Sequence, residues 1–160
     1  YALVIAQYKR GHYGVGDEES FHWALVVIAG EHDLSGPMYQ VTNRINHTRD
    51  GVAWDISYAD SVSLMKSSMC LGGVRIGTIM KSDLKEFKKI VAGNTPQPDS
   101  DQWNCRDWIM QCLRLLEGKG WLSDGIRTQQ DLFPLLKQAS LLTVQNGTPA
   151  TLKFSPSRSS

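Results

Sequence analysis

The chain has 160 residues, of which 41% are hydrophobic and 21% are charged, and its formal net charge is +1. These values are typical of a soluble globular protein with one hydrophobic core. The charge is too small to indicate broad electrostatic binding to nucleic acid or to an anionic membrane. The longest apolar run, residues 23–30, is far shorter than a membrane span, so we expect none.

The chain contains three cysteines, Cys70, Cys105 and Cys112. An odd and sparse set of cysteines does not form a disulfide framework, and this favours a reducing compartment, which we take to be the cytoplasm. No group of residues has the spacing of metal ligands, and the glycine-rich segment 11–16 lacks the lysine of a phosphate-binding loop. We therefore expect neither a metal nor a cofactor.

The first half of the chain is expected to form strands. Phe21–Ala29 is nearly continuous in Trp, Leu, Val and Ile, as in a strand that is covered on both faces. Glycines at 72, 73 and 77 predict bulges in a later strand. The expected strands are 1–9, 21–29, 38–42, 52–58 and 70–79.

The second half is expected to form helices over 83–92, from 101–104 to about 117, and over 128–139, where Pro134 predicts a kink. Strands followed by helices predict an α+β fold, with an antiparallel sheet packed against a few helices. We expect a single catalytic-type domain over 1–147 and a mobile tail over 148–160, which is rich in Ser, Thr and Pro.

Cys105 lies where a nucleophile would be placed. Apolar residues recur at helical spacing from this position, and both Asp101 and Asn104 are plausible N-caps. The first turn of a helix favours a thiolate, because its backbone N–H groups and the helix dipole stabilise negative charge. The alternative is that Cys105 is a packing residue, since free cysteines are among the most buried residues.

His22 is the candidate base. The other three histidines lie in predicted loops, whereas His22 lies inside the most apolar strand, between Phe21 and Trp23. An imidazole in such a place is fixed, and its neighbours control its protonation. The alternative is a core histidine that is hydrogen-bonded for structural reasons.

The segment Asn104–Ile109 resembles the Asn-Cys-x-x-aromatic-aliphatic helix start of the circularly permuted papain-like thiol enzymes. That group includes lecithin:retinol acyltransferase-like enzymes, PPPDE isopeptidases and, more distantly, NlpC-type peptidases. Phe21–Val27 resembles the histidine strand that precedes the cysteine helix in these proteins. The resemblance implies that Cys105 is the nucleophile, that His22 is the base, and that the Cys105 backbone N–H stabilises an oxyanion.

The resemblance also implies a third polar residue on the next strand, which orients the imidazole. Gln40 is the best candidate, and Asp55 is the second choice. Trp103, Asn104 and Trp23 flank the two reacting residues, so we expect them to contact the substrate.

The predicted function is therefore a cysteine-dependent hydrolase or an acyl or peptidyl transferase. It would act on an ester, thioester or amide, either of a small acyl compound or of a peptide or isopeptide, through a covalent acyl-enzyme. A thiol protease and an acyltransferase both belong to this class. Two alternatives remain open: a non-catalytic binding module on the same fold, and a cyclase or lyase that acts on small molecules.

Overall fold

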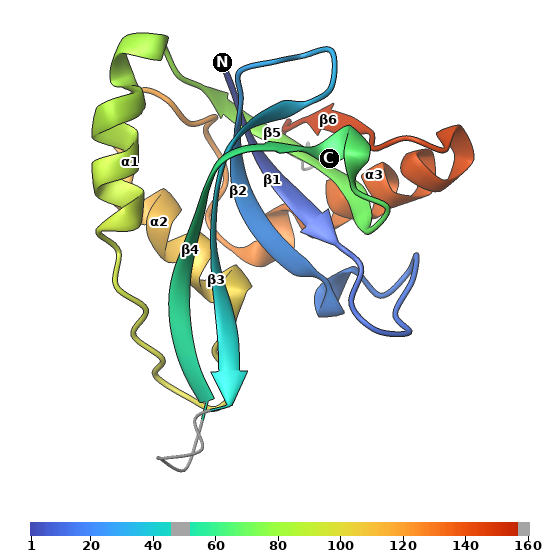
Figure 1. The fold of residues 1–160 in the computed structure, drawn as a ribbon, viewed down its shortest axis with the longest axis horizontal. Helices are drawn as coiled ribbons and strands as arrows, with labels where there is room; N and C mark the ends of the chain where they lie inside the picture. The colour runs from blue at the N-terminus through green and yellow to red at the C-terminus, as the bar shows by residue number, and fades with distance from the viewer. Residues whose placement is uncertain (46–51, 157–160) are drawn as a thin grey trace.

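Six strands form one sheet in the order β4-β3-β2-β1-β5-β6, and three α-helices pack against it (Figure 1). The computed structural model describes residues 1–45 and 52–156. The predicted α+β class is confirmed. The strands are β1 (Ala2–Tyr8), β2 (His22–Ile28), β3 (Ser35–Ile45), β4 (Val52–Ser63), β5 (Cys70–Thr78) and β6 (Thr151–Lys153), and the α-helices are α1 (Leu84–Ala92), α2 (Cys105–Leu115) and α3 (Phe133–Asn146).

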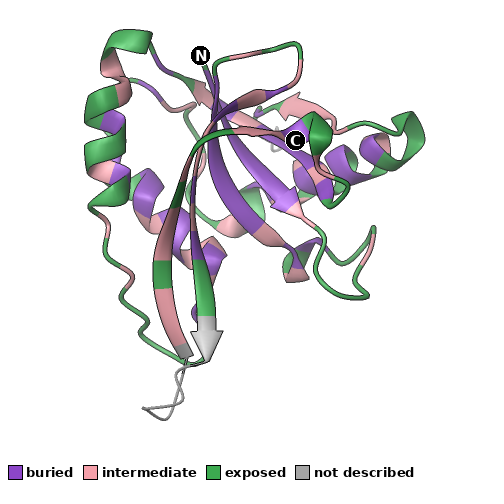
Figure 2. Ribbon diagram, in the orientation of Figure 1, coloured by how far each residue is buried: buried purple, intermediate pink, exposed green. Residues whose placement is uncertain are grey.

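The middle of the sheet is covered on both faces, as the apolar sequence of β2 predicts. Figure 2 shows β1 and β2 buried along nearly their whole length. Trp23, Leu25 and Val27 of β2 belong to the core that the three helices share. The intervening residues Ala24 and Val26 belong to a smaller core on the opposite face. Because successive side chains of β2 point to opposite faces of the sheet, this one strand contributes to both cores.

All three helices lie on the same face of the sheet. Each contributes buried side chains to the larger core, including Phe87 from α1, Trp108 from α2 and Leu136 from α3. The opposite face is covered instead by Leu34 and Leu64, which lie near the ends of β3 and β4. None of the helices within 1–45 and 52–156 is both long and apolar enough to cross a membrane.

The predicted bulges are found where β5 pairs with β1. The register shifts between Leu3 and Val4 and again between Ala6 and Tyr8, opposite the glycine-rich part of β5. Gly72 has a φ of +83°, and a Cβ atom there would lie 2.3 Å from the carbonyl oxygen of Ala150. A side chain is therefore excluded at this position by both conformation and space.

The last helix, α3, differs from the sequence prediction. Pro134 lies in the first turn of α3, where its missing N–H costs no helical hydrogen bond, so it starts the helix instead of kinking it. The helix then continues past residue 139 to Asn146 and ends at Gly147, which has a φ of +74°.

Part of the predicted tail is ordered structure, which corrects that prediction. Thr151–Lys153 form β6, which pairs in parallel with β5, whereas every other strand pair in the sheet is antiparallel. Phe154 is buried, and its N–H donates to the carbonyl of Arg75 at 2.8 Å. The segment is ordered because its backbone pairs with the edge strand β5 and the Phe154 side chain is buried in the core. Residues 157–160 lie outside the described residues.

Candidate active site

A local separation of two neighbouring strands makes room for the candidate site. Among the described residues, β2 and β3 are paired only at Leu25–Tyr39 and Val26–Met38. The start of β2, from His22, therefore lacks a strand partner on that side. The first turn of α2 packs against this region and supplies Cys105.

Asn104 is the N-cap that fixes the start of α2. Its side-chain oxygen accepts the N–H of Arg106 at 2.9 Å, and its own N–H donates to the Asp107 carboxylate at 2.9 Å. This reciprocal arrangement is a capping box, and it leaves Cys105 as the first helical residue. The Cys105 N–H then has no acceptor within its own helix, as the expected oxyanion donor requires.

The Cys105 sulfur is held between the strand and the imidazole. The N–H of Trp23, left unpaired by the separation of β2 and β3, donates to Sγ at 3.5 Å. The His22 side chain acts on the same sulfur, because it lowers the pKa of the Cys105 thiol. Only 1% of the residue is exposed, so a substrate reaches the sulfur only when the side chains that cover it move.

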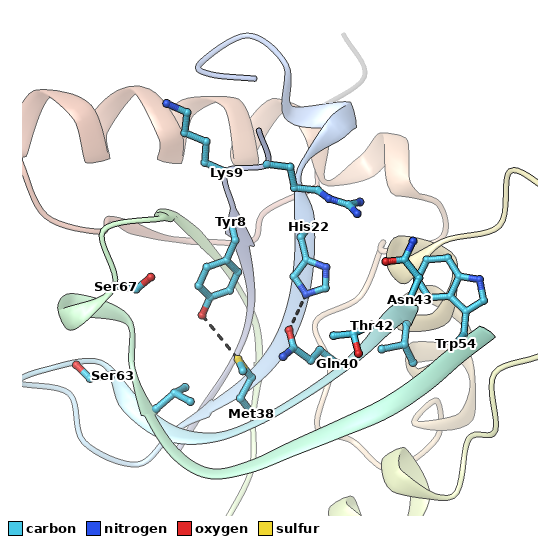
Figure 3. A pocket seen from close by; sticks show the side chains of 13 residues that line it. Tyr8, Lys9, His22, Met38, Gln40, Thr42, Asn43, Trp54, Ser63 and Ser67 are labelled. Carbon is cyan, nitrogen blue, oxygen red and sulfur yellow. Dashed lines mark hydrogen bonds between the residues drawn. The ribbon is translucent and has the colours of Figure 1, made fainter. Parts of the chain in front are cut away.

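The predicted orienting residue contacts the imidazole directly. Nε2 of His22 lies 2.6 Å from Oε1 of Gln40 (Figure 3). Because an amide oxygen only accepts hydrogen bonds, this contact favours a proton on Nε2 of His22. Gln40 thus favours the tautomer in which Nδ1 carries no proton.

The pKa of the Cys105 thiol reflects opposing effects. Burial raises it, and this is the largest single effect. The hydrogen bond and charge of His22, the N–H of Trp23 and the charge of Arg106 all lower it, and together they leave the pKa below its ordinary value. The surroundings of Cys105 therefore favour the thiolate.

The pKa of His22 moves in the complementary direction. Burial lowers it, whereas the hydrogen bond and charge of Cys105 and the hydrogen bond to Gln40 raise it. The positive charge of Arg10 opposes this rise, but the net shift is upward. The two shifts have the directions in which a thiolate and an imidazolium stabilise each other.

The other two cysteines lie in unreactive surroundings. Burial raises the pKa of Cys70 to about 11 and that of Cys112 to about 12. Hydrogen bonds from Cys70 to the Gly72 carbonyl and from Asn94 to Cys112 offset only part of this effect. Cys105 is therefore the one cysteine of the three whose thiolate is stabilised.

A cavity of about 540 Å³ opens beside His22 and Gln40. Figure 3 shows these two side chains in its middle, with Tyr8 and Met38 on one side and Trp54 on the other. Its size is that of a small-molecule site. Cys105 is not among the residues that line it.

The three residues expected to contact substrate lie outside this cavity. Trp23 is fully buried in the core, and Asn104 caps α2. Trp103 is 4% exposed and packs edge-on against Trp54 with ring centroids 5.3 Å apart. It therefore contacts Trp54, which lines the cavity, without lining the cavity itself. Asp55, the second choice for orienting His22, lies on β4 opposite Thr42.

Several residues that shape the site were missed from the sequence. Arg106 donates from Nη1 to the Phe21 carbonyl at 2.8 Å, which ties the start of α2 to the start of β2. The sequence could have indicated this role of Arg106, because Arg106 directly follows Cys105. Tyr8 is opposite His22 in the register of β1 and β2, a relation that only strand pairing reveals. Met38 shares the alternation of Gln40 along β3, which could have suggested a common face.

No group of three His, Cys, Asp or Glu side chains within 1–45 and 52–156 could hold a metal ion. A family of unknown function, DUF6914, matches residues 1–136, a span that includes Cys105, His22 and Gln40. No curated protein and no solved structure matches the chain.

Proposed function

We propose that this chain, which belongs to the DUF6914 family, is a cysteine hydrolase or acyl or peptidyl transferase of the permuted papain-like class. The observation that carries the proposal is the placement of Cys105 at the first turn of α2, with His22 acting on its thiol and Gln40 lying 2.6 Å from the His22 imidazole. In this proposal Cys105 is the nucleophile, His22 is the base and Gln40 orients the imidazole. Substrates would be esters, thioesters or amides of small acyl compounds or peptides.

In the acylation step, the Cys105 thiolate attacks the carbonyl carbon and a C–S bond forms. The carbonyl oxygen takes up the electron pair, and the N–H of Cys105 at the helix start stabilises it. When the intermediate collapses, the bond to the leaving group breaks and the proton on Nδ1 of His22 passes to the leaving atom. A thioester on Cys105 and a neutral imidazole remain.

In the second step, water or another nucleophile resolves the thioester. His22 accepts a proton at Nδ1 as the nucleophile adds to the carbonyl carbon, and the C–S bond then breaks. The thiolate–imidazolium pair is restored. We rank hydrolysis above transfer, because no residue of the cavity marks a second substrate site.

One observation favours a different class of function. Cys105 is 1% exposed, which suits a packing residue in a non-catalytic binding module on the same fold. The pKa shifts argue for the enzyme, because a buried cysteine without a base has a raised pKa, as Cys70 and Cys112 have.

The experiment that tests the proposal is to find the acyl-enzyme. The protein is incubated with p-nitrophenyl acetate, quenched in acid and measured by intact mass, and the adduct is located by peptide mapping. We expect one acetyl group on Cys105, none on Cys70 or Cys112, and a large loss of acetylation in His22→Ala.

An absence of acetyl-Cys105 with a folded protein would overturn the proposal and favour the binding module. Folding is checked by circular dichroism of each variant, so that loss of reaction is not confused with loss of structure. A cytoplasmic location accords with this chemistry, because three free cysteines are typical of a reducing compartment.

A further inference from the structure

The cavity beside His22 contacts only one side of the catalytic pair. His22 and Gln40 line it, whereas Cys105 does not. In the reaction proposed above, the acyl group bonds to the sulfur and the leaving group receives its proton from the imidazole. A cavity that adjoins the imidazole and not the sulfur is therefore positioned for the leaving group.

The walls of this cavity are apolar near the imidazole. The Tyr8 ring lies 6.2 Å from the His22 ring, and the Tyr8 hydroxyl contacts the Met38 sulfur at 3.8 Å. Burial raises the pKa of Tyr8, so its phenol stays neutral. Val62 and Trp54 add further apolar surface. An aliphatic or aromatic group fits between these side chains.

The charged residues that line the cavity are all basic. Its lining includes Lys9 and Arg10 but no Asp or Glu, although the whole chain has nearly equal numbers of acids and bases. Arg10 is close enough to lower the pKa of both His22 and Arg106. Its guanidinium has no ion pair or side-chain hydrogen bond with any residue of the described part of the chain. An anion beside the imidazole would therefore reduce the repulsion between Arg10 and the positive charges near it. The anion would also accept two hydrogen bonds from the planar Arg10 guanidinium.

We propose that this cavity is a leaving-group site for an apolar residue with a free carboxylate, as at the C-terminus of a peptide, and that Arg10 binds the carboxylate. This inference rests on the proposed function, because it assigns a leaving group to the Cys105–His22 pair. The bond to the leaving atom breaks near Nδ1 of His22, and the carboxylate of the departing residue remains on Arg10.

Two esters that differ only in the charge of the leaving group test the proposal. Both carry an acetyl group on the hydroxyl of phenyllactate. One has the free carboxylate, and the other has the carboxamide. Each gives the same acetyl-Cys105, so the ratio of their kcat/KM values, divided by the ratio of their rates with a free small thiol, reports the leaving-group site. We expect the carboxylate ester to be favoured by about tenfold, as for a charge-assisted hydrogen bond.

Arg10→Gln should bring the kcat/KM ratio of the two esters close to one. Arg114→Gln removes the same charge from an exposed position in the last turn of α2 and should keep the preference. Equal rates for both esters in the unmodified protein, or a preference that survives Arg10→Gln, would overturn the inference and leave the proposed function standing. If neither ester nor p-nitrophenyl acetate acylates Cys105, the proposed function fails and the inference fails with it.

Discussion

The reactivity of Cys105 depends on a balance that one substitution can reverse. Burial raises the pKa of its thiol, and His22 supplies the first of the effects that lower it. His22→Ala removes the hydrogen bond and the charge but leaves most of the burial. The pKa of Cys105 should then rise above the value of a free thiol, as it does for the buried Cys112.

This change is measured as the rate of iodoacetamide labelling of each cysteine against pH. In the unmodified protein, Cys105 should label fastest, with a midpoint below about 8.5, the value of a free cysteine. In His22→Ala, its rate at pH 7 should fall by roughly tenfold or more. His12→Ala removes an exposed histidine and should leave the profile unchanged. An identical profile in both variants would contradict the pairing of Cys105 with His22.

Gln40 has a separate role, because it touches the imidazole and not the sulfur. Gln40→Leu removes the acceptor on Nε2 at similar size, which lowers the pKa of His22 and frees the ring to rotate. Acetylation of Cys105 should slow by about tenfold, the effect of one hydrogen bond to a charged group. The rate is measured by release of p-nitrophenol, with Gln138→Leu on the exposed face of α3 as the control. A rate equal to that of the control would remove Gln40 from the site.

At the scale of the element, the start of α2 holds the N-cap of the helix and the proposed nucleophile. Substitutions of Asn104 separate the effect on stability from the effect on the thiol. Asn104→Ala removes the cap on the N–H of Arg106 and should lower the free energy of unfolding by about 1 kcal/mol. Asn104→Asp keeps a capping oxygen, so stability should be retained. Its negative charge next to Cys105 should raise the pKa of the thiol.

Urea unfolding gives the stability of each Asn104 variant, and the pH profile of labelling gives the pKa of Cys105. A loss of stability in Asn104→Asp equal to that in Asn104→Ala would show that the cap is not what Asn104 contributes. An unchanged labelling profile in Asn104→Asp would show that the charge of residue 104 does not reach the sulfur.

For the molecule as a whole, the C-terminal segment adds the edge strand β6 to the sheet and the Phe154 side chain to the larger core. Phe154 is 4% exposed and follows β6 directly, so Phe154→Ala should lower the free energy of unfolding by about 3–5 kcal/mol. Ser155→Ala, one residue further on and exposed, should change it by less than about 0.5 kcal/mol. Equal effects of the two substitutions in urea unfolding would mean that the segment is not packed in solution.

The parts of the fold that were predictable from sequence are those with strong local patterns. The apolar run of β2, the helical spacing from Cys105 and the N-cap Asn104 are each readable within about a dozen residues. β6 was missed because three residues carry no periodicity and pair only with a strand about eighty residues earlier. The end of α3 was missed because its polar and apolar residues do not separate cleanly into two faces.

The candidate site was predictable only as a set of residue types. The sequence and its resemblance suggested Cys105, His22 and Gln40, and Gln40 lies 2.6 Å from His22. Sequence patterns could not show the separation of β2 from β3, since strand register depends on contacts across the whole sheet. For the same reason, the cavity lined by Tyr8, Met38 and Trp54 was not foreseen, and the flanking tryptophans were expected to line the substrate site instead.

The spacing of the three thiols has a consequence for oxidation. Peroxide attacks thiolates, so it would convert Cys105 to a sulfenic acid before it reached the other two sulfurs. Cys112 lies on the same helix about 10 Å further along its axis, beyond the reach of a disulfide, and its thiol is protonated. The oxidised sulfur therefore finds no resolving thiol on its own helix. A small external thiol such as glutathione would return the sulfenic acid to the thiol, whereas further oxidation to the sulfinic acid would be irreversible.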